Sequence, residues 1–225
     1  WYHQTKVHDS HNTHFASKIW GLRATDIMQG VVFGTSFPDQ SQDPKLATRL
    51  DFDQAFGTAI NRFCVQAVAG HPLTLYGKGT MRRAFLPLRD SMRCLCLAVE
   101  NPPVAGEYRV FNQFAESYTI HELAYLVQAV WRELGADVAV KHYENPRVEK
   151  EQHYYNPIRE NLDRLGYVPT RDVRAEIRAM LQSLQPFNKR LSAHKHILVP
   201  DIRWDGQRKR SNELKQVSQD KQSNQ

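Results

Sequence analysis

Short apolar runs alternate with segments of helical periodicity along this chain, and the alternation limits the folds open to it. Apolar side chains recur at helical spacing over residues 53–68 and 119–134, whereas residues 73–76 and 138–142 are short apolar runs. Strands that alternate with helices form a sheet covered by helices. We therefore expect an α/β fold rather than an all-helical one.

Local signals predict the remaining elements. A helix over residues 1–20 that began upstream ends before Gly21, a residue suited to a helix C-terminus. Residues 22–33 alternate and then become an apolar run typical of an interior strand. Thr119 and Glu122 have the spacing of a capping box. We also expect a loop over 38–49, strands over 84–88 and 108–112, and helices over 89–99 (capped by Asp90 or Ser91), 157–165 and 171–184.

Length and composition exclude several classes of protein. The 225 residues suffice for one core, or for one core and a smaller lobe. No apolar run approaches the roughly 20 residues of a membrane span, and no signal peptide is visible. The net charge of +6 includes a basic cluster at 208–210 in a polar stretch. We expect residues 206–225 to be a disordered, solvated tail, with neither nucleic acid nor a membrane as partner.

The cysteines and histidines have simple interpretations. Three cysteines without framework spacing, Cys64, Cys94 and Cys96, predict core residues in a reducing compartment rather than disulfides. His194 and His196, near the tail, are expected to face solvent. His8, His11 and His14 recur every three residues on the first helix, a spacing that can bind metal. No carboxylate or cysteine is placed to complete such a site, so no metal is expected.

Tyr2 and Lys6 form the pattern Y-x-x-x-K on the first helix. Residues four apart on a helix share one face, with Cβ atoms about 5–6 Å apart. A free tyrosine, with a pKa near 10, is a poor base at neutral pH, but a nearby cation favours the phenolate. Such a pair can take a hydroxyl proton while hydride leaves the same carbon. Alone the pattern is weak, because an exposed Tyr–Lys pair satisfies it too.

The surroundings of this pair strengthen the hypothesis. The run from Tyr2 to Lys6 and on to Asn12, together with several later motifs, resembles the extended short-chain dehydrogenases that act on nucleotide sugars, the NAD-dependent epimerases and dehydratases. The later motifs that carry the resemblance are Arg23–Asp26 with Gln29–Val32, Phe56–Ala59 with Asn61–Gln66, Gly70–Thr74, Val110–Phe114, Asn145–Glu149 and His153–Asn156.

The resemblance implies a role for particular residues. Tyr2 would be the catalytic acid and base, and Lys6 would hold the nicotinamide ribose of NAD and tune Tyr2. Gln29 would lie beside the nicotinamide. Arginine suits diphosphate oxygens, because its guanidinium is a planar fork of donors. The residues implied around the UDP part of a substrate are Thr58, Thr74, Leu75, Tyr76, Arg83, Arg147, Val148 and Glu149. His153 would approach the sugar.

The resemblance also implies an architecture. Residues 1–36 would end an NAD-binding Rossmann domain, and residues 37–205 would form a smaller α/β substrate-binding lobe with the remaining elements of the Rossmann-like parallel sheet. The glycine fingerprint that cradles a dinucleotide is absent from the sequence. We expect it upstream of Trp1, with the Ser or Thr that assists the tyrosine. The chain alone should therefore bind NAD poorly and have little activity.

The motifs together resemble the members of this family that convert UDP-glucose and sulfite into a sulfonated sugar nucleotide for sulfolipid synthesis. That resemblance implies a homodimer when complete, in the cytoplasm or, in a photosynthetic eukaryote, the plastid stroma. Two alternatives stay open. One is a UDP-sugar 4-epimerase or dehydratase, which needs no sulfite. The other is a non-catalytic module that binds a sugar nucleotide or a protein.

Overall fold

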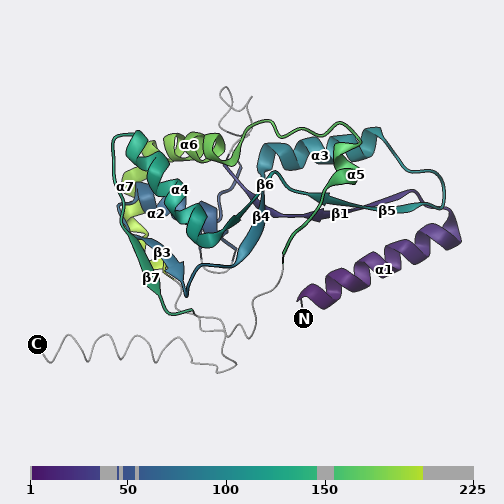
Figure 1. The fold of residues 1–225 in the computed structure, drawn as a ribbon, viewed down its shortest axis with the longest axis horizontal. Helices are drawn as coiled ribbons and strands as arrows, with labels where there is room; N and C mark the ends of the chain where they lie inside the picture. The colour runs from purple at the N-terminus through teal and green to yellow at the C-terminus, as the bar shows by residue number, and fades with distance from the viewer. Residues whose placement is uncertain (1, 36–44, 46–47, 54–55, 146–154, 200–225) are drawn as a thin grey trace, which may run out of the picture.

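The computed structural model describes residues 2–35, 45, 48–53, 56–145 and 155–199, which form helices packed on short, mostly parallel strands (Figure 1). The predicted α/β class is confirmed. The helices are α1 (Tyr2–Trp20), α2 (Ala59–Val68), α3 (Leu88–Glu100), α4 (Ile120–Glu133), α5 (Glu160–Asp163), α6 (Val173–Leu184) and α7 (Asn188–Ala193), with 3₁₀ turns η3 (Gln185–Phe187) and η4 (Lys195–Ile197). The strands are β1 (Ala24–Gln29), β2 (Val31–Phe33), β3 (Leu73–Tyr76), β4 (Arg82–Pro87), β5 (Tyr108–Gln113), β6 (Glu116–Thr119) and β7 (Val140–Tyr143).

Three strand pairings are parallel. Strand β1 pairs with β5, β2 pairs with β4, and β3 pairs with β7, while β6 runs antiparallel to β4. In the first pair Ala24 lies opposite Tyr108 and Gln29 opposite Gln113, so the carboxyl ends of β1 and β5 are level. Ligands of α/β proteins bind at such carboxyl ends.

Gly30 divides the run predicted as one strand over residues 22–33 into β1 and β2. Its backbone N–H donates to the carbonyl of Gln113, and the chain then changes partner from β5 to β4. A Cβ at this position would lie 2.7 Å from the carbonyl oxygen of Ala84, so only glycine allows the approach. The chain thus changes its neighbouring strand directly after Gln29.

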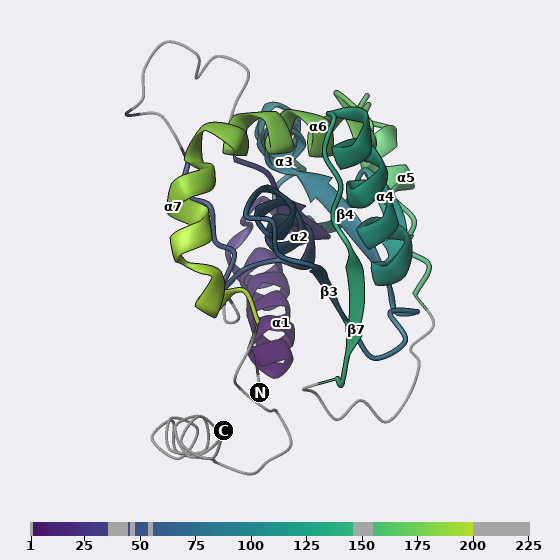
Figure 2. The ribbon, with the colours of Figure 1, turned by 90° about the vertical axis from the view of Figure 1, so that its left-hand side faces the viewer.

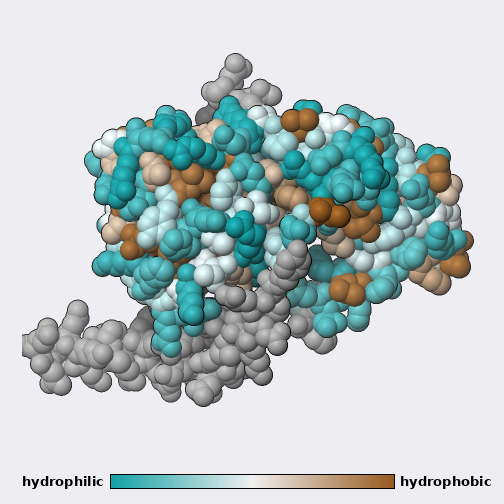
Figure 3. Space-filling view, in the orientation of Figure 1, coloured by the Kyte–Doolittle hydropathy of each residue, from teal (hydrophilic) through white to brown (hydrophobic). Residues whose placement is uncertain are grey.

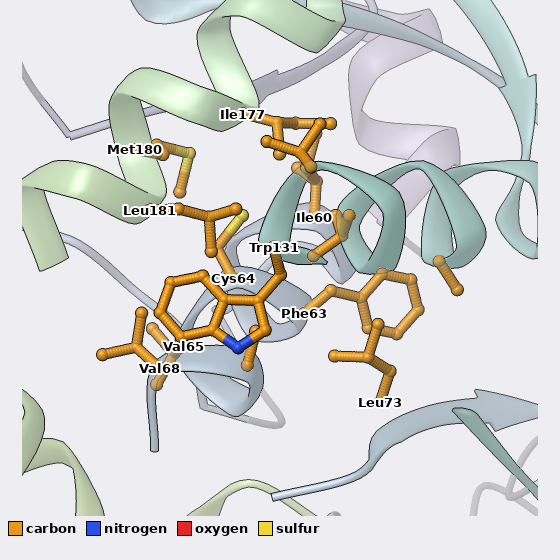
Figure 4. Packing of buried hydrophobic residues seen from close by; sticks show 14 of the residues in the cluster. Ile60, Phe63, Cys64, Val65, Val68, Leu73, Trp131, Ile177, Met180 and Leu181 are labelled. Atoms are coloured by element: carbon orange, nitrogen blue, oxygen red, sulfur yellow. The ribbon is translucent and has the colours of Figure 1, made fainter. Parts of the chain in front are cut away.

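The larger core lies between α2, α4, α6 and the strand β3. Phe63, Cys64 and Leu73 are fully buried there, and Trp131 packs beside them (Figure 4). Seen from this end of the molecule, α2 lies in the middle, with α7 and α4 on either side and α6 above (Figure 2). Helix α2 is buried along nearly its whole length, which explains why it carries so few charges.

A smaller core joins α3 and α5 to one side of the β1–β5 pair. Its fully buried members are Cys94 and Leu162, which pack with Phe111 of β5. Helix α1 lies on the other side of the same strand pair (Figure 1). The β1–β5 pair therefore separates a packed face from the face that carries α1.

Several local predictions need correction. Helix α2 begins at Ala59 rather than near residue 53, because the Thr58 hydroxyl caps it. Helix α3 begins at Leu88 without a side-chain cap, and neither Asp90 nor Ser91 caps it. The buried Asp90 carboxylate instead accepts hydrogen bonds from Thr170. The helix expected over 157–165 is limited to α5, strand β7 begins at Val140 rather than near 138, and β6 and α7 were not predicted.

The cysteines agree with the prediction only in part. Cys64 and Cys94 are buried, but Cys96 is exposed, because two residues along a helix turn a side chain to another face. His194 and His196 are exposed as predicted. Within the described ranges no helix is long and apolar enough to cross a membrane. Most of the predicted 38–49 loop and all of the 206–225 tail lie outside those ranges.

Candidate active site

Tyr2 and Lys6 lie on one face of the first turns of α1. The ammonium nitrogen of Lys6 lies 5.7 Å from the centroid of the Tyr2 ring. A cation at this distance interacts favourably with the face of an aromatic ring. Both side chains are exposed, so the pair is open to a ligand. The helical spacing places the two groups as expected, while their catalytic role stays a proposal.

A polar cluster joins α1 to the strand pair. The Asp26 carboxylate, half-buried on β1, accepts hydrogen bonds from the Ser10 hydroxyl of α1 at 2.5 Å and from the Tyr108 hydroxyl of β5 at 2.6 Å. Burial and the Asp26 carboxylate raise the pKa of Tyr108. The ring of His14 stacks on that of Tyr108, with centroids 4.9 Å apart. We call Ser10, Asp26 and Tyr108 the Asp26 cluster.

Gln29 stands at the carboxyl end of β1 with its side chain exposed. Its amide nitrogen donates to the Ser91 hydroxyl at 2.7 Å and to the Gln113 side-chain oxygen at 3.2 Å. Both donor positions of this amide are therefore engaged, which leaves the carbonyl oxygen of Gln29 as an acceptor. An acceptor of this kind suits a carboxamide N–H, such as that of a nicotinamide.

The residues predicted to surround UDP have different environments. Thr58 caps α2. On β3, Thr74 and Leu75 are fully buried, and the backbone and hydroxyl of Thr74 are held by the side chain of Gln66. The ring of Tyr76 lies under the guanidinium of Arg62, 4.8 Å from its centroid, and burial raises the pKa of its hydroxyl. The side chains of Thr74 and Leu75 thus belong to the core.

Of the two arginines predicted to bind the diphosphate, Arg83 lies within the described residues. Its side chain lies on β4, with one guanidinium nitrogen donating to the carbonyl of Arg82 and the guanidinium carbon 5.8 Å from the centroid of the Tyr155 ring. Arg147, Val148, Glu149 and His153 lie outside the described residues.

The Asp26 cluster was not predicted from the sequence. Asp26 stands in one of the motifs that carry the family resemblance, and Ser10 stands four residues after Lys6. That spacing continues the ridge of the Tyr–Lys pair, and Ser10 also stands in the run to Asn12 that carries the resemblance. The third member, Tyr108, is 82 residues away from Asp26 in sequence, so no local pattern joins them.

The histidines of α1 do not form a metal site. Among the residues that the structure describes, no three His, Cys, Asp or Glu side chains gather in a way that could hold a metal ion. His8, His11 and His14 are exposed on the helix, and the ring of His14 is engaged with Tyr108.

The fold is shared with solved nucleotide-sugar enzymes. UDP-glucose 4-epimerase from Thermotoga maritima aligns with a TM-score of 0.64 at 16% identity, over 80% of this chain and 52% of its own. The dTDP-glucose 4,6-dehydratase DesIV from Streptomyces venezuelae aligns with a TM-score of 0.59 at 20% identity, over 81% and 50%. The chain therefore has the Rossmann-like fold of the epimerases and dehydratases of the extended short-chain dehydrogenase type.

Sequence comparison finds relatives of one particular kind within this class of enzymes. The chain is 46% identical over 203 residues to UDP-sulfoquinovose synthase of Sulfolobus acidocaldarius and 44% identical over 203 residues to the chloroplastic UDP-sulfoquinovose synthase of Spinacia oleracea. Each alignment covers 90% of this chain, but only 51% and 42% of those relatives. The chain is thus a homologue of UDP-sulfoquinovose synthases that spans about half their length. No protein-family model matches it.

Proposed function

We propose that this chain supplies the catalytic helix and much of the substrate-binding part of an NAD-dependent enzyme that makes UDP-sulfoquinovose from UDP-glucose and sulfite. The observation that carries the proposal is the Tyr2–Lys6 pair, 5.7 Å from cation to ring centroid, at the start of a helix beside the β1–β5 pair. Identity of 46% over 203 residues to a UDP-sulfoquinovose synthase supports the choice of reaction.

The residues present fit a nicotinamide cofactor. Gln29 offers a carbonyl oxygen at the carboxyl end of β1, and Lys6 offers an ammonium group that suits ribose hydroxyls. When bound, NAD would supply reversible hydride transfer at C4 of the sugar. The DesIV neighbour was solved with NAD bound, in agreement with this choice.

Tyr2 is the group that moves the proton. Acting as the base, it takes the proton of the sugar O4 hydroxyl as C4 is oxidised to a ketone. That ketone acidifies the neighbouring C5–H, and loss of the C5 proton with the C6 hydroxyl releases water and leaves an enone. The sulfur of sulfite then bonds to C6, a proton returns to C5, and Tyr2 returns its proton to O4 as C4 is reduced. The C6 hydroxyl is thus exchanged for a sulfonate, with one water released.

The substrate diphosphate is proposed to lie near Arg83 and Arg147. A guanidinium donates two parallel hydrogen bonds to phosphate oxygens, and Arg83 is exposed at its guanidinium end beside the Tyr155 ring. Thr58, Thr74, Leu75 and Tyr76 are proposed to line the UDP site, with the buried side chains of Thr74 and Leu75 shaping the strand beneath it. Val148 and Glu149 complete the proposed substrate set.

The test uses the protein expressed with its upstream coding sequence. Incubated with UDP-glucose, NAD and sulfite, it should form a product with the mass of UDP-sulfoquinovose, and Tyr2→Phe should abolish turnover while UDP-glucose still binds. Turnover without sulfite would favour a 4-epimerase or dehydratase. If Tyr2→Phe changes nothing, a non-catalytic binding module becomes the better explanation.

The chain alone is proposed to bind NAD weakly, since its sequence has no glycine fingerprint. Titration calorimetry with the 225-residue chain should show no micromolar binding of NAD. Micromolar binding would mean that the residues present here suffice for the cofactor. The compartment is proposed to be the cytoplasm, or the plastid stroma in a photosynthetic eukaryote.

A homodimer is proposed for the complete protein. Apolar side chains of α1 face solvent, among them Phe15 and Ile19, and apolar surface is visible at the end of the molecule where α1 lies (Figure 3). Exposed apolar patches of this kind mark contact surfaces. Light scattering should give twice the monomer mass, and Phe15→Asp with Ile19→Asp should shift the protein toward monomer. A monomeric wild type would refute the dimer.

A further inference from the structure

Polar contacts join helix α1 to the β1–β5 pair. One carboxylate oxygen of Asp26, Oδ2, accepts hydrogen bonds from both the Ser10 hydroxyl of α1 and the Tyr108 hydroxyl of β5. The His14 ring of α1 stacks on the Tyr108 ring, with centroids 4.9 Å apart. Two side chains of the helix therefore contact the strand pair.

The residues of α1 that meet the strands lie on the same ridge of the helix as the candidate catalytic pair. Tyr2, Lys6, Ser10 and His14 succeed one another at intervals of four residues, so they form one ridge that turns by about 40° per step. Two members of this ridge contact the strand pair, Ser10 through Asp26 and His14 through the Tyr108 ring. The rotation of α1 about its axis is thereby set, and with it the direction of Lys6.

The same contact sets the height of Tyr2 above the sheet edge. Helix α1 runs back along β1, which comes after it beyond Gly21, so its first residues lie toward the carboxyl end of β1 (Figure 1). Tyr2 precedes Ser10 by about 12 Å of helix axis. Gln29 lies beyond Asp26 by about 10 Å of strand. A bond between Ser10 and Asp26 therefore brings Tyr2 level with Gln29, where the nicotinamide is proposed to lie.

We propose that Asp26 is a positioning residue for the reaction. Its carboxylate fixes the rotation and the axial placement of α1 on the β1–β5 pair, and so delivers the Tyr2 hydroxyl to the reacting carbon. This inference rests on the proposed function for its purpose, whereas the structural part, a helix joined to the strand pair through Asp26, stands on the contacts alone.

Ser10→Ala is the sharpest test, because it removes the helix side of the cluster and leaves the Asp26–Tyr108 bond in place. Alanine is the better helix former, so the variant should not lose helix for local reasons. Thr13→Ala is the matched control: the Thr13 hydroxyl lies on the same helix but donates to the carbonyl of Asp9 within it. Asp26→Asn is the conservative variant, since it keeps an oxygen acceptor at the site.

In the protein with its upstream sequence, Ser10→Ala should lower kcat about tenfold with the KM for UDP-glucose nearly unchanged, because misplacement of a catalytic group by less than an ångström has such effects. Its α1 amides should exchange hydrogen faster than in the wild type. Thr13→Ala should match the wild type in all three measurements, and Asp26→Asn should retain more activity than Asp26→Ala.

If Ser10→Ala matches Thr13→Ala in turnover and in exchange, the inference is wrong while the proposed function stands. A fall in kcat with the KM for UDP-glucose raised in parallel would reveal general structural damage, and would also overturn the inference. A wild type that turns over no UDP-sugar refutes the proposed function instead, and the exchange comparison still decides whether Asp26 holds α1.

Discussion

The ammonium nitrogen of Lys6 lies 5.7 Å from the centroid of the Tyr2 ring, one helical turn away on the same face of α1. Lys6→Ala should lower turnover by at least about 100-fold, because the cation beside the proposed base Tyr2 is lost and the proposed proton transfer slows. Lys6→Arg, which keeps the charge, should retain part of the activity. Steady-state kinetics with UDP-glucose measures both. Lys18→Ala, at the exposed end of the same helix, is the control, and equal losses at both lysines would contradict the prediction.

The capping box of α4 predicts a specific acid sensitivity. The backbone N–H of Thr119 donates to the Glu122 carboxylate at 2.7 Å, and this bond, with Arg82 adding to it, holds the pKa of Glu122 below its usual value. A carboxyl whose pKa is lowered in the folded state stabilises the fold above its unfolded value, near 4.3, and loses that contribution as the pH falls through the folded value.

Urea unfolding at pH 6 and pH 3 should therefore show a loss of stability that is smaller in Glu122→Gln, which keeps an acceptor but does not titrate. Thr119→Ala should cost about 1 kcal/mol at neutral pH. Identical acid slopes in the wild type and Glu122→Gln would contradict this assignment.

The buried ion pair between Arg89 and Glu176 should be costly to break. Arg89 Nε lies 3.3 Å from Glu176 Oε2, and the side chains are only 9% and 4% exposed. Burial raises the pKa of Glu176, although Arg89 opposes that shift. Glu176→Leu leaves a buried, uncompensated guanidinium and should destabilise the fold by about 3–5 kcal/mol.

Replacing both partners, with Arg89→Met and Glu176→Leu, should cost less than the single change, as measured by denaturant unfolding. Arg164→Ala, in an exposed pair with Glu160, should change stability by less than about 0.5 kcal/mol. The explanation fails if the double variant is less stable than the single variant Glu176→Leu.

The three cysteines should differ in reactivity. Burial raises the pKa of the Cys64 thiol and raises that of Cys94 to about 12, whereas Cys96 is exposed. Since the thiolate is the reactive form, a thiol reagent at pH 8 should label one cysteine in the native protein and three in denaturant. Mass spectrometry counts the labels, and Cys96→Ser should remove the native one. Rapid labelling of Cys64 in the native state would contradict the burial.

Sequence patterns located the elements whose signals are local. The capping box at Thr119 and Glu122 marked the start of α4 correctly, and Gly21, with φ of 65°, stands just beyond the end of α1 as expected. The Tyr2–Lys6 pair lies on one face because helical geometry requires it. Elements that depend on distant partners were missed: β6 forms because residues 116–119 pair with β4, and four residues are too short a run to show a strand period.

The amino-acid sequence by itself determined the α/β class, the main helices, the candidate catalytic pair and, through its motifs, the kinship with nucleotide-sugar enzymes. Only the tertiary structure decided that Gly30 ends one strand and begins another, that Cys96 faces solvent, and that Asp26 joins Ser10 to Tyr108. The reason is physical. Periodicity and caps act between residues a few positions apart, whereas strand partners and buried polar contacts are chosen among residues that only the folded chain brings together.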